Sequence, residues 1–387
     1  MTIAALAALI WLYLYALHGD FWRSTPELAA IPTTGPDIDT GLGLDTGLDT
    51  TIDIIVPARD EAGTIGAVIT SLLAQTGIAG SRVILVDDGS TDGTAEAARA
   101  AAGGDPRFTL ITAGPKPVGW SGKLWALEQG IAHSTAPLLL LTDADITHDP
   151  RHLATLRARI DRPERGARLD LVSEMVRLNC VSPAERALIP AFVYFFQLLY
   201  PFARVNDPLS ATAAAAGGVV LIRRTALERI GGIASIRGAL IDDVTLARRV
   251  KQGGAIYLGH TSLARSIRPY PRLGDITAMI ARTAFTQLRH SYVLLALTIA
   301  GMALIWLVPP AAILIGTPGA RLFGLIAYAV AVLTYQPTLQ RYRLGWAWGL
   351  ALPLIALIYL QATLASAWRY AHGAGAAWKN RDYGTTA

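Results

Sequence analysis

The sequence of 387 residues contains a single cysteine, Cys180. One cysteine excludes an intramolecular disulfide and is compatible with a reducing compartment. Charged residues are also scarce, at 16% of the chain against about 25% in ordinary soluble domains. The formal net charge is +5, but no run of Lys and Arg is dense enough for a nucleic-acid-binding tract. The positive balance is better suited to anionic lipid or to a diphosphate.

Apolar residues are abundant instead, at 52% of the chain, and they are concentrated near its two ends. Residues 3–17 are almost entirely apolar, and this length of about 15 residues is short for a bilayer span. The segment lacks the positive start and the small-residue cleavage site of a secretory signal peptide. We therefore predict an uncleaved membrane anchor over residues 1–20. A linker rich in Thr, Gly, Asp and Pro is predicted over 21–51.

The C-terminal third contains three apolar segments that favour a membrane location. Residues 292–315 carry no charge over a length that can cross about 30 Å of hydrocarbon. Residues 346–368 are apolar over a similar length, and residues 322–335 form a shorter segment between them. These patterns predict a C-terminal transmembrane region over 291–370 and a tail over 371–387.

The charges that flank these segments bear on topology. By the positive-inside tendency, Arg341 and Arg343 favour a cytoplasmic location. Arg369, Lys379 and Arg381 follow the last segment, and simple alternation would place them on the opposite side. One segment is therefore a candidate for a re-entrant or interfacial location. We predict a multi-pass protein of the inner (cytoplasmic) membrane, with its central domain facing the cytoplasm.

The central domain, predicted over 52–290, alternates short apolar strands with amphipathic helices. Strands are expected at 52–56, 83–86, 108–111 and 138–141, and a further strand near 217–224. Between the first two strands, apolar residues recur at helical spacing at positions 65, 68, 69, 72 and 73. Continuous apolar strands that alternate with helices predict an α/β fold with a mostly parallel sheet and helices on both faces.

Polar and acidic side chains follow these strands where each strand ends. Because the carboxyl ends of parallel strands lie along one edge of a sheet, where open α/β sheets bind ligands, we expect these side chains to meet. Carboxylates two positions apart suit Mg²⁺ or Mn²⁺, which also take oxygens from a substrate diphosphate. The alternative is that the acids belong to ordinary turns and helix caps. The groups concerned are Pro57, Arg59 and Glu61 after the first strand, Asp87 and Asp88 after the second, and Asp143 and Asp145 after the fourth.

Two further groups stand at predicted helix starts. Lys123 precedes a helix, where a lysine can meet phosphate, although a solvent-facing side chain is the alternative. Asp242 and Asp243 begin another helix, whose dipole stabilises an ionised carboxylate. Such a carboxylate can take the proton of a nearby acceptor hydroxyl, or it can merely cap the helix. His260 follows, and a lone histidine is more often structural than a metal ligand.

The order and spacing of four sequences resemble the family 2 glycosyltransferases of the GT-A fold. They lie at residues 56–61, 86–94, 142–145 and 242–250, and the resemblance covers residues 52–260. The terminal apolar segments, together with residues 119–127 and 281–289, resemble a narrower group. These are the membrane-bound glycosyltransferases associated with hopanoid biosynthesis.

The resemblance implies a role for most of these residues. It places Asp87 and Asp88 at the uracil and ribose of a nucleotide, with Pro57, Arg59, Glu61, Lys123 and Asp143 in the same donor-binding set. Asp143 and Asp145 match the acids that bind the divalent metal, Mg²⁺ or Mn²⁺, at the donor diphosphate. Asp243 matches the general base, and Asp242 replaces the family's usual Glu.

The resemblance is weaker beyond residue 270. Processive relatives carry Gln/Arg-x-x-Arg-Trp there, and this chain has only incomplete matches that contain Arg282 and Arg289. This departure disfavours a polysaccharide synthase and leaves the two arginines as candidate diphosphate contacts.

The sequence therefore predicts an inverting glycosyltransferase that moves a sugar from a nucleotide donor, UDP-linked by resemblance, to a membrane lipid such as a hopanoid. Its expected partners are the donor, the lipid and the bilayer, with no nucleic acid. Residues 187–203, rich in aromatics and interrupted by prolines, favour an interfacial segment that docks the site on the bilayer, or alternatively a core helix.

Two other functions stay open. The first is a polyprenyl-phosphate sugar synthase, which shares the donor chemistry and needs additional basic groups for its phosphate acceptor. The second is a membrane transport or export partner with a degenerate sugar-binding domain. The apolar segments lack the intramembrane charges expected along a polar solute path, which disfavours the transporter.

Overall fold

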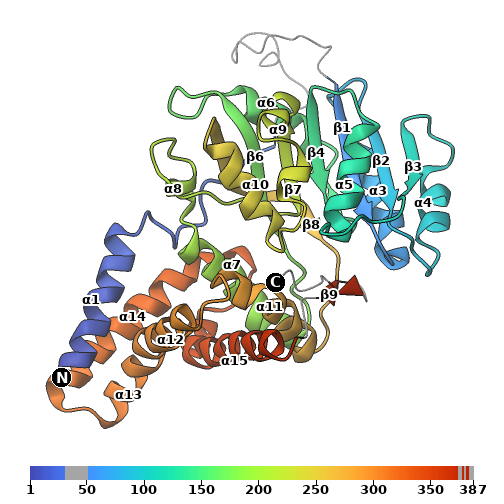
Figure 1. Cartoon of the computed structure of the whole chain (residues 1–387). Coiled ribbons are helices and arrows are strands. Elements are labelled where there is room, and N and C mark those ends of the chain that lie inside the picture. Colours follow the sequence, from blue (N-terminus) through green and yellow to red (C-terminus); the bar gives the residue numbers. More distant parts are fainter. Residues whose placement is uncertain (31–50, 374–376, 379–380, 383–387) are drawn as a thin grey trace.

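The computed structural model describes residues 1–30, 51–373, 377–378 and 381–382. An α/β domain lies on one side of a group of apolar helices, and the helices come from both ends of the chain (Figure 1). Most of the predicted linker and most of the predicted tail lie outside the described residues.

One eight-stranded sheet, in the order β3-β2-β1-β4-β7-β6-β8-β5, forms the centre of the α/β domain. Six of its strands run in the same direction, whereas β7 and β5 are antiparallel to their neighbours. The predicted α/β fold with a mostly parallel sheet is thus confirmed, as a mixed sheet. The strands are β1 Ile52–Ala58, β2 Arg82–Asp87, β3 Phe108–Thr112, β4 Leu138–Thr142, β5 Ile146–His148, β6 Leu169–Arg177, β7 Val219–Arg223 and β8 Ala255–Ser266.

Helices cover both faces of this sheet, as Figure 1 shows. Successive side chains of a strand point to opposite faces, so alternate residues of β1 belong to two different cores. Ile55 packs in the core that includes Leu124 of α5, whereas Ile54 packs in the core that includes Ile65 of α3. The helices of the domain are α3 Ala62–Leu73, α4 Thr94–Ala102, α5 Gly122–Ala132, α6 His152–Asp161, α9 Arg224–Arg229 and α10 Asp242–Lys251, with a 3-10 turn η1 Ile233–Ile236.

In the part of the chain that the structure describes, three segments are long and apolar enough to cross a membrane: Tyr292–Ile315, Pro318–Arg341 and Trp346–Ala371. They agree with the three predicted segments, and the second is longer than predicted. The N-terminal helix α1 (Thr2–Leu17) is shorter. The helices within the segments are α12 Tyr292–Met302, η2 Ala303–Leu307, α13 Val308–Ile315, α14 Pro318–Arg341, η3 Trp346–Ala351 and α15 Leu352–Ala371.

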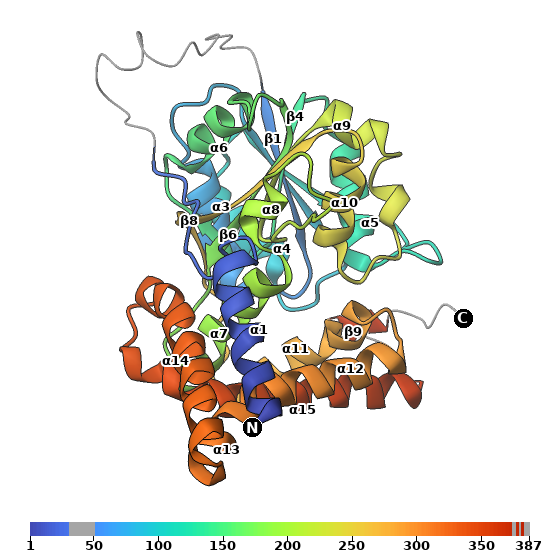
Figure 2. The same ribbon diagram turned by 90° about the vertical axis from the view of Figure 1, so that its left-hand side faces the viewer.

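The apolar helices do not all run in the same direction. Helix α1 packs along α14, whereas α15 runs across the side of the helical group that lies under the α/β domain (Figure 2). A short antiparallel pair, β9 Ala377–Trp378 and β10 Arg381–Asp382, follows α15.

Three helices join the two parts: α7 Pro183–Leu199, α8 Phe202–Val205 and α11 Leu273–Gln287. Helix α7 contains most of the segment predicted to be interfacial, and it packs against α11, α14 and α15. The hydroxyl of Tyr194 lies 2.7 Å from that of Thr334, and the ring of Phe195 lies 4.7 Å from that of Tyr359. This segment is therefore a packed connector, and its contact with a bilayer stays a prediction.

Candidate active site

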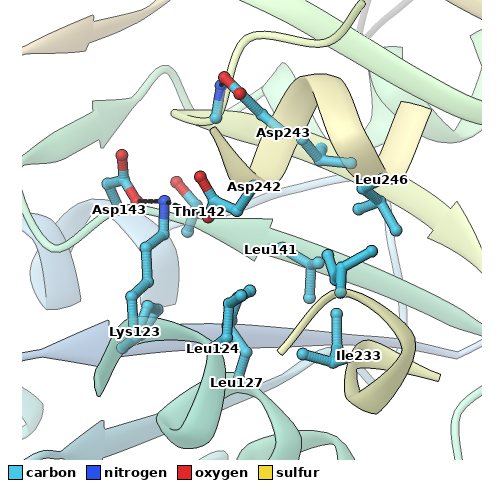
Figure 3. Close-up of a pocket in the computed structure, with 14 residues that line it drawn as sticks. Lys123, Leu124, Leu127, Leu141, Thr142, Asp143, Ile233, Asp242, Asp243 and Leu246 are labelled. Atoms are coloured by element: carbon cyan, nitrogen blue, oxygen red, sulfur yellow. Dashed lines mark hydrogen bonds and ion pairs between the residues drawn. The ribbon is translucent and has the colours of Figure 1, made fainter. Parts of the chain in front are cut away.

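A pocket opens at the edge of the sheet where β1 and β4 end. Lys123 of α5, Asp143 after β4 and Asp242 of α10 point toward one another across it (Figure 3). Its remaining lining is largely apolar and includes Leu124, Leu127, Leu141, Ile233 and Leu246. Parts of the chain that are about 100 residues apart therefore meet at the edge that parallel strands predict.

Lys123 is the cation at the centre of the pocket. Ser121 caps α5 by accepting a hydrogen bond from the backbone N–H of Leu124, which fixes the start of the helix. The Lys123 Nζ atom lies 2.8 Å from Asp143 Oδ1 and 3.3 Å from Asp242 Oδ2. Burial lowers the pKa of this lysine, but the two carboxylates outweigh burial and raise it, so the side chain stays charged.

Asp243 is held by backbone groups. Its Oδ2 atom accepts a hydrogen bond of 2.9 Å from the N–H of Gly217, and its Oδ1 atom accepts one of 2.7 Å from the N–H of Val244. Burial, and next the charge of Asp242, raise the pKa of Asp243 to about 7. A carboxyl with a pKa near neutrality can both accept and release a proton, as a general base must. The residue lines the same pocket as Lys123.

Asp145 is engaged elsewhere, although it lies only two residues from Asp143. Its Oδ2 atom lies 2.8 Å from Arg268 Nε and accepts a hydrogen bond of 3.2 Å from the hydroxyl of Ser266. The other end of the Arg268 guanidinium lies 2.5 Å from Glu61 Oε1. Burial lowers the pKa of Arg268, but Asp145 and Glu61 outweigh it and raise the value. Glu61 and Asp145 are 7% and 8% exposed, so this is a nearly buried ion-pair cluster.

The remaining residues of the β1 and β2 edge form a second group. Pro57 lines the pocket. Arg59 Nη1 lies 3.7 Å from Asp88 Oδ2. Asp87 Oδ1 accepts hydrogen bonds from the backbone N–H and the hydroxyl of Ser90, at 2.9 and 2.5 Å. Asp87 therefore stabilises its own turn, as the alternative reading of the sequence expects, and donor binding by this group stays a prediction.

The two arginines predicted near the diphosphate lie at the membrane side of the domain. Arg282 is an exposed residue of α11, and Arg289 lies in the turn after that helix with φ 53°. Within the described part of the chain, neither forms an ion pair with an acidic side chain. Arg282 lies near Tyr270, whose pKa is raised by burial and lowered by the charges of Arg268 and Arg282.

A divalent cation at Asp143 and Asp145 is what the resemblance implies, and the arrangement of the side chains does not fit it directly. Each carboxylate already has a basic partner, Lys123 for the first and Arg268 for the second. Among the described residues, no group of three or more His, Cys, Asp or Glu side chains is placed to hold a metal ion. The metal role of these acids stays a prediction, and we derive no step through a metal.

Sequence reasoning missed three residues of this region: Ser266, Arg268 and Gly217. All three lie beside strands of the edge, Ser266 at the end of β8 and Gly217 before β7. A Cβ atom at Gly217 would lie 3.3 Å from Asp243 Oδ2, so the glycine leaves room for the carboxylate. His260 is fully buried, and its ring lies 4.9 Å from that of Phe202, in agreement with the structural role expected of it.

Comparison with known proteins gives one family match. Residues 53–231 match the sequence model described as "Glycosyl transferase family 2". An N-acetylglucosaminyltransferase of Rhizobium leguminosarum bv. viciae is 31% identical over 170 residues, which are 43% of this chain and 38% of the relative. A 4,4'-diaponeurosporenoate glycosyltransferase of Staphylococcus aureus is 35% identical over 96 residues, 25% of this chain and 24% of the relative. The chain thus spans well under half the length of these relatives.

A solved structure matches over nearly the whole chain. The mannosyltransferase PcManGT from Pyrobaculum calidifontis, in complex with GDP-Man and Mn²⁺, superposes with a TM-score of 0.52 at 20% sequence identity. The match covers 94% of this chain and 97% of that one, so the two proteins share their fold.

Proposed function

We propose that this chain, whose residues 53–231 form a family 2 glycosyltransferase domain, transfers a sugar from a nucleotide donor to a lipid acceptor with inversion at the anomeric carbon. One observation carries the proposal. The pocket places Lys123, Asp143 and Asp243 together, at the edge of the α/β domain that faces the apolar helices. A cation for the diphosphate and a base for the acceptor are the two groups that such a transfer needs.

The donor side rests on the residues at the carboxyl ends of β1, β2 and β4. Lys123 can form charge-assisted hydrogen bonds with the diphosphate. A bound diphosphate would take over part of the contact that Lys123 now makes with Asp143 and Asp242. Asp87 and Asp88 are the proposed contacts of the base and ribose, with a uracil nucleotide as the first choice.

The chemical step rests on Asp243. The acceptor oxygen attacks the anomeric carbon as the bond from that carbon to the nucleoside diphosphate breaks. Asp243 takes the proton of the acceptor hydroxyl, and the diphosphate leaves with its bonding electron pair beside Lys123. Backbone N–H groups of Gly217 and Val244 hold the carboxylate in place, so little reorganisation is needed when the acceptor arrives.

A divalent cation belongs to the proposal but not to the steps above. PcManGT was solved with GDP-Man and Mn²⁺, and it shares the fold of this chain. A cation held by Asp143 and Asp145 would add charge stabilisation at the departing diphosphate. Mg²⁺ and Mn²⁺ are the candidates.

The acceptor is proposed to be a membrane lipid. The Gln287 side chain of α11 donates a hydrogen bond of 2.5 Å to the hydroxyl of Tyr200. Burial raises the pKa of that tyrosine, and the negative charge of Asp243 adds a smaller increase. A helix beside the apolar segments is therefore linked to the neighbourhood of the general base. A lipid hydroxyl at the bilayer surface would reach Asp243 from this side. A hopanoid is one such acceptor, by the narrower resemblance.

The same contacts support an orientation in the membrane. Arg341, at the end of α14, lies 3.0 Å from Glu27 and donates a hydrogen bond to the carbonyl of Thr261 in β8. The positive end of this segment is thus on the side of the α/β domain. By the positive-inside tendency, we place that domain on the cytoplasmic side of the inner membrane.

A phosphate acceptor is the second candidate. The observation that favours it is Arg282, exposed on α11 near Tyr270 and without an acidic partner among the described residues. An arginine in this position could bind the phosphate of a polyprenyl phosphate.

The test uses the full chain purified in detergent and returned to lipid nanodiscs. Release of UDP from UDP-sugars is measured with hydroxyl lipids, polyprenyl phosphate or no acceptor, and lipid products are identified by mass spectrometry. We expect glycolipid formation that depends on the hydroxyl lipid and is lost in Asp243→Asn. Asp105→Asn, in the loop before β3 away from the pocket, is the matched control. The absence of both UDP release and a glycosylated lipid with every donor tested would contradict the proposal. A product on polyprenyl phosphate alone would select the second candidate.

A further inference from the structure

Four buried polar side chains form a chain of hydrogen bonds that runs from β6 to the pocket. Glu174 Oε2 of β6 lies 2.5 Å from His152 Nε2 of α6, and the Nδ1 atom of His152 lies 2.8 Å from that of His148. His148 Nε2 lies 3.1 Å from the hydroxyl oxygen of Thr142, at the end of β4. All four residues are at most 6% exposed. Only Thr142 among them lines the pocket (Figure 3), so the proposed reaction leaves the other three without a role.

The direction of the links in this chain follows from one carbonyl group. The Thr142 hydroxyl has a single hydrogen, which it donates to the carbonyl of Gly218 at 2.8 Å. The hydroxyl must therefore accept a hydrogen bond from His148 Nε2. Burial, and next the charge of His152, hold the pKa of His148 well below its ordinary value, so this ring is neutral and its Nδ1 atom carries no hydrogen. His152 must then donate from its own Nδ1 atom.

Glu174 keeps His152 in that role. With Nδ1 protonated, His152 meets the acid either as an imidazolium beside a carboxylate or as a neutral ring beside a carboxylic acid. Both forms place one proton between His152 Nε2 and Glu174 Oε2. Without the acid, a neutral His152 could carry its hydrogen on Nε2 instead, and every link as far as Thr142 would reverse. The Thr142 hydroxyl would then donate to His148, and the carbonyl of Gly218 would lose its donor.

The far end of the chain is the turn that holds the proposed general base. Gly218 follows Gly217, whose N–H donates the hydrogen bond of 2.9 Å to Asp243 Oδ2. The hydroxyl of Ser173, which precedes Glu174 on β6, accepts a hydrogen bond of 2.8 Å from the N–H of the residue before Gly217. Strand β6 thus supports the turn by two routes, one direct and one through the chain. Loss of the second route would free the N–H of Gly217 to move away from the carboxylate.

We propose that Glu174 is a positioning residue for the general base. It acts through the two histidines and Thr142, which together fix the turn before β7 and the N–H group that holds Asp243. The inference rests on the proposed role of Asp243 in sugar transfer, and it adds a remote acid on which the geometry of that base depends. Glu174 touches neither the donor nor the acceptor, and the reaction moves no proton along the chain.

The position of the turn has a measurable effect on Asp243. The Gly217 hydrogen bond favours the ionised carboxylate and lowers its pKa, against burial and the charge of Asp242. Asp242 and Lys123, the charged groups that act on this pKa, are untouched by a substitution at position 174. A weaker Gly217 contact should therefore move the rising limb of the kcat profile up by about 0.5–1 pH unit. A base held less firmly should also lower the plateau of kcat by about tenfold, with the Kd for UDP unchanged.

Two substitutions at Glu174 separate its hydrogen bond from its packing. Glu174→Met removes the polar end and keeps a side chain of similar length, so the direction of the chain is no longer set. Glu174→Gln keeps a donor, because its amide N–H can bond to Nε2 of a neutral His152 and leave Nδ1 as the donor to His148. Asn206→Leu is the matched control for loss of stability. Asn206 is also buried, bonds to the backbone of Leu258 at 2.7 and 2.9 Å, and does not line the pocket.

The experiment makes two measurements on the full chain in nanodiscs. The first is hydrogen exchange at the amide of Gly217, followed by mass spectrometry, which needs no sugar transfer. The second is the pH profile of UDP release. Glu174→Met should speed exchange at Gly217 by about tenfold and shift the limb, and Glu174→Gln should restore most of both. Asn206→Leu should lower the melting temperature without either change.

Several outcomes would overturn the proposal. Exchange at Gly217 that is equal in the wild type and Glu174→Met does so, and so does an equal rise in Glu174→Met and Asn206→Leu, which would mean a general loss of stability. Faster exchange with an unmoved limb does so as well, since the turn would then move without effect on the base.

Two further cases stay decidable. If Glu174→Met does not fold, as judged by its melting, the isosteric Thr142→Val decides alone, because it removes the hydroxyl that bonds to the turn, and it must then show the faster exchange. A wild type that releases no UDP from any donor refutes the proposed function, whereas the exchange measurement still decides whether Glu174 holds the turn.

Discussion

The Oδ2 atom of Asp243 accepts a hydrogen bond of 2.9 Å from the backbone N–H of Gly217. The contact joins the start of α10 to the turn before β7, two segments that lie 26 residues apart. It fixes the carboxylate at the pocket wall, while burial and Asp242 keep its pKa near 7. The Gly217 hydrogen bond itself lowers the pKa of Asp243, so burial and Asp242 act against the contact that positions the carboxylate.

The first prediction concerns this carboxylate. Asp243→Asn keeps the size of the side chain and removes the base, so turnover should fall by about 10²–10⁴-fold while the Kd for UDP stays within a few-fold of wild type. Turnover is measured by UDP release and nucleotide binding by calorimetry. A variant that keeps wild-type turnover would show that another group takes the proton.

The second prediction is the pH dependence of turnover. A general base must be deprotonated, so kcat should rise as pH increases through about 7, the pKa of Asp243, and level off above it. Lys123 lowers that pKa by its positive charge. Lys123→Met should therefore move the rising limb of the profile to higher pH and weaken UDP binding.

Lys116→Met is the control for this shift. Lys116 lies in the loop before α5, and its Nζ atom donates a hydrogen bond to the carbonyl of Trp120 rather than to an acid. Its profile should coincide with that of the wild type. A Lys123→Met profile with an unmoved limb would mean that the limb does not belong to Asp243.

The sequence was sufficient to locate β1 to β4 and β7, because their residues are apolar and bounded by turns or helices. It did not predict β6 and β8. Strand β6 contains Asp170 and Glu174, and β8 contains His260, so neither reads as an apolar run. These polar groups are nevertheless buried, and Glu174 lies 2.5 Å from His152 of α6. Local patterns cannot reveal a partner that the chain supplies from a distant helix.

The site shows the same limit. Lys123, Asp143 and Asp243 line one pocket, and the sequence could bring them together because each follows a recognisable strand end or helix start. The pairing of Asp145 with Arg268 could not be predicted, since the two residues lie 123 positions apart. Only the parallel direction of β4 and β8 brings their ends to the same edge.

The third prediction concerns the N-terminal helix. Trp11 Nε1 donates a hydrogen bond of 2.8 Å to the carbonyl of Ile305. Pro309 and Pro310 follow Ile305 by four and five residues and have no N–H, so neither the α-helical nor the π-helical partner of this carbonyl exists. Trp11, which is fully buried, supplies the missing donor.

Trp11→Phe should therefore lower the stability of the chain by about 1–2 kcal/mol, since it leaves the Ile305 carbonyl without a donor. The melting temperature in detergent measures the change. Trp22→Phe removes a solvent-exposed hydrogen bond that the half-buried Trp22 donates to the carbonyl of Tyr15, and should have a smaller effect. Equal shifts for the two variants would contradict a special role for the Trp11 contact.

The fourth prediction is loss of stability in acid through His260. Among the described residues, neither ring nitrogen of this buried residue has a hydrogen-bond partner. Burial, with the charge of Arg341, lowers its pKa to about 3. In the unfolded chain the pKa is about 6.5. As pH falls below 6.5, only the unfolded state gains the proton, so this residue should cost about 1.4 kcal/mol of stability per pH unit until the folded pKa is reached.

His260→Leu removes the titrating group. It should therefore flatten the fall of melting temperature between pH 7.5 and about pH 5, because the loss of free energy of unfolding that His260 causes in this range is gone. His133→Leu changes an exposed histidine on α5's C-terminal side and should keep the wild-type slope. The comparison is of slopes, so an effect of either substitution on packing at neutral pH cancels. An unchanged slope in His260→Leu would mean that the ring gains a proton, or a partner, within the folded chain, and would contradict the prediction.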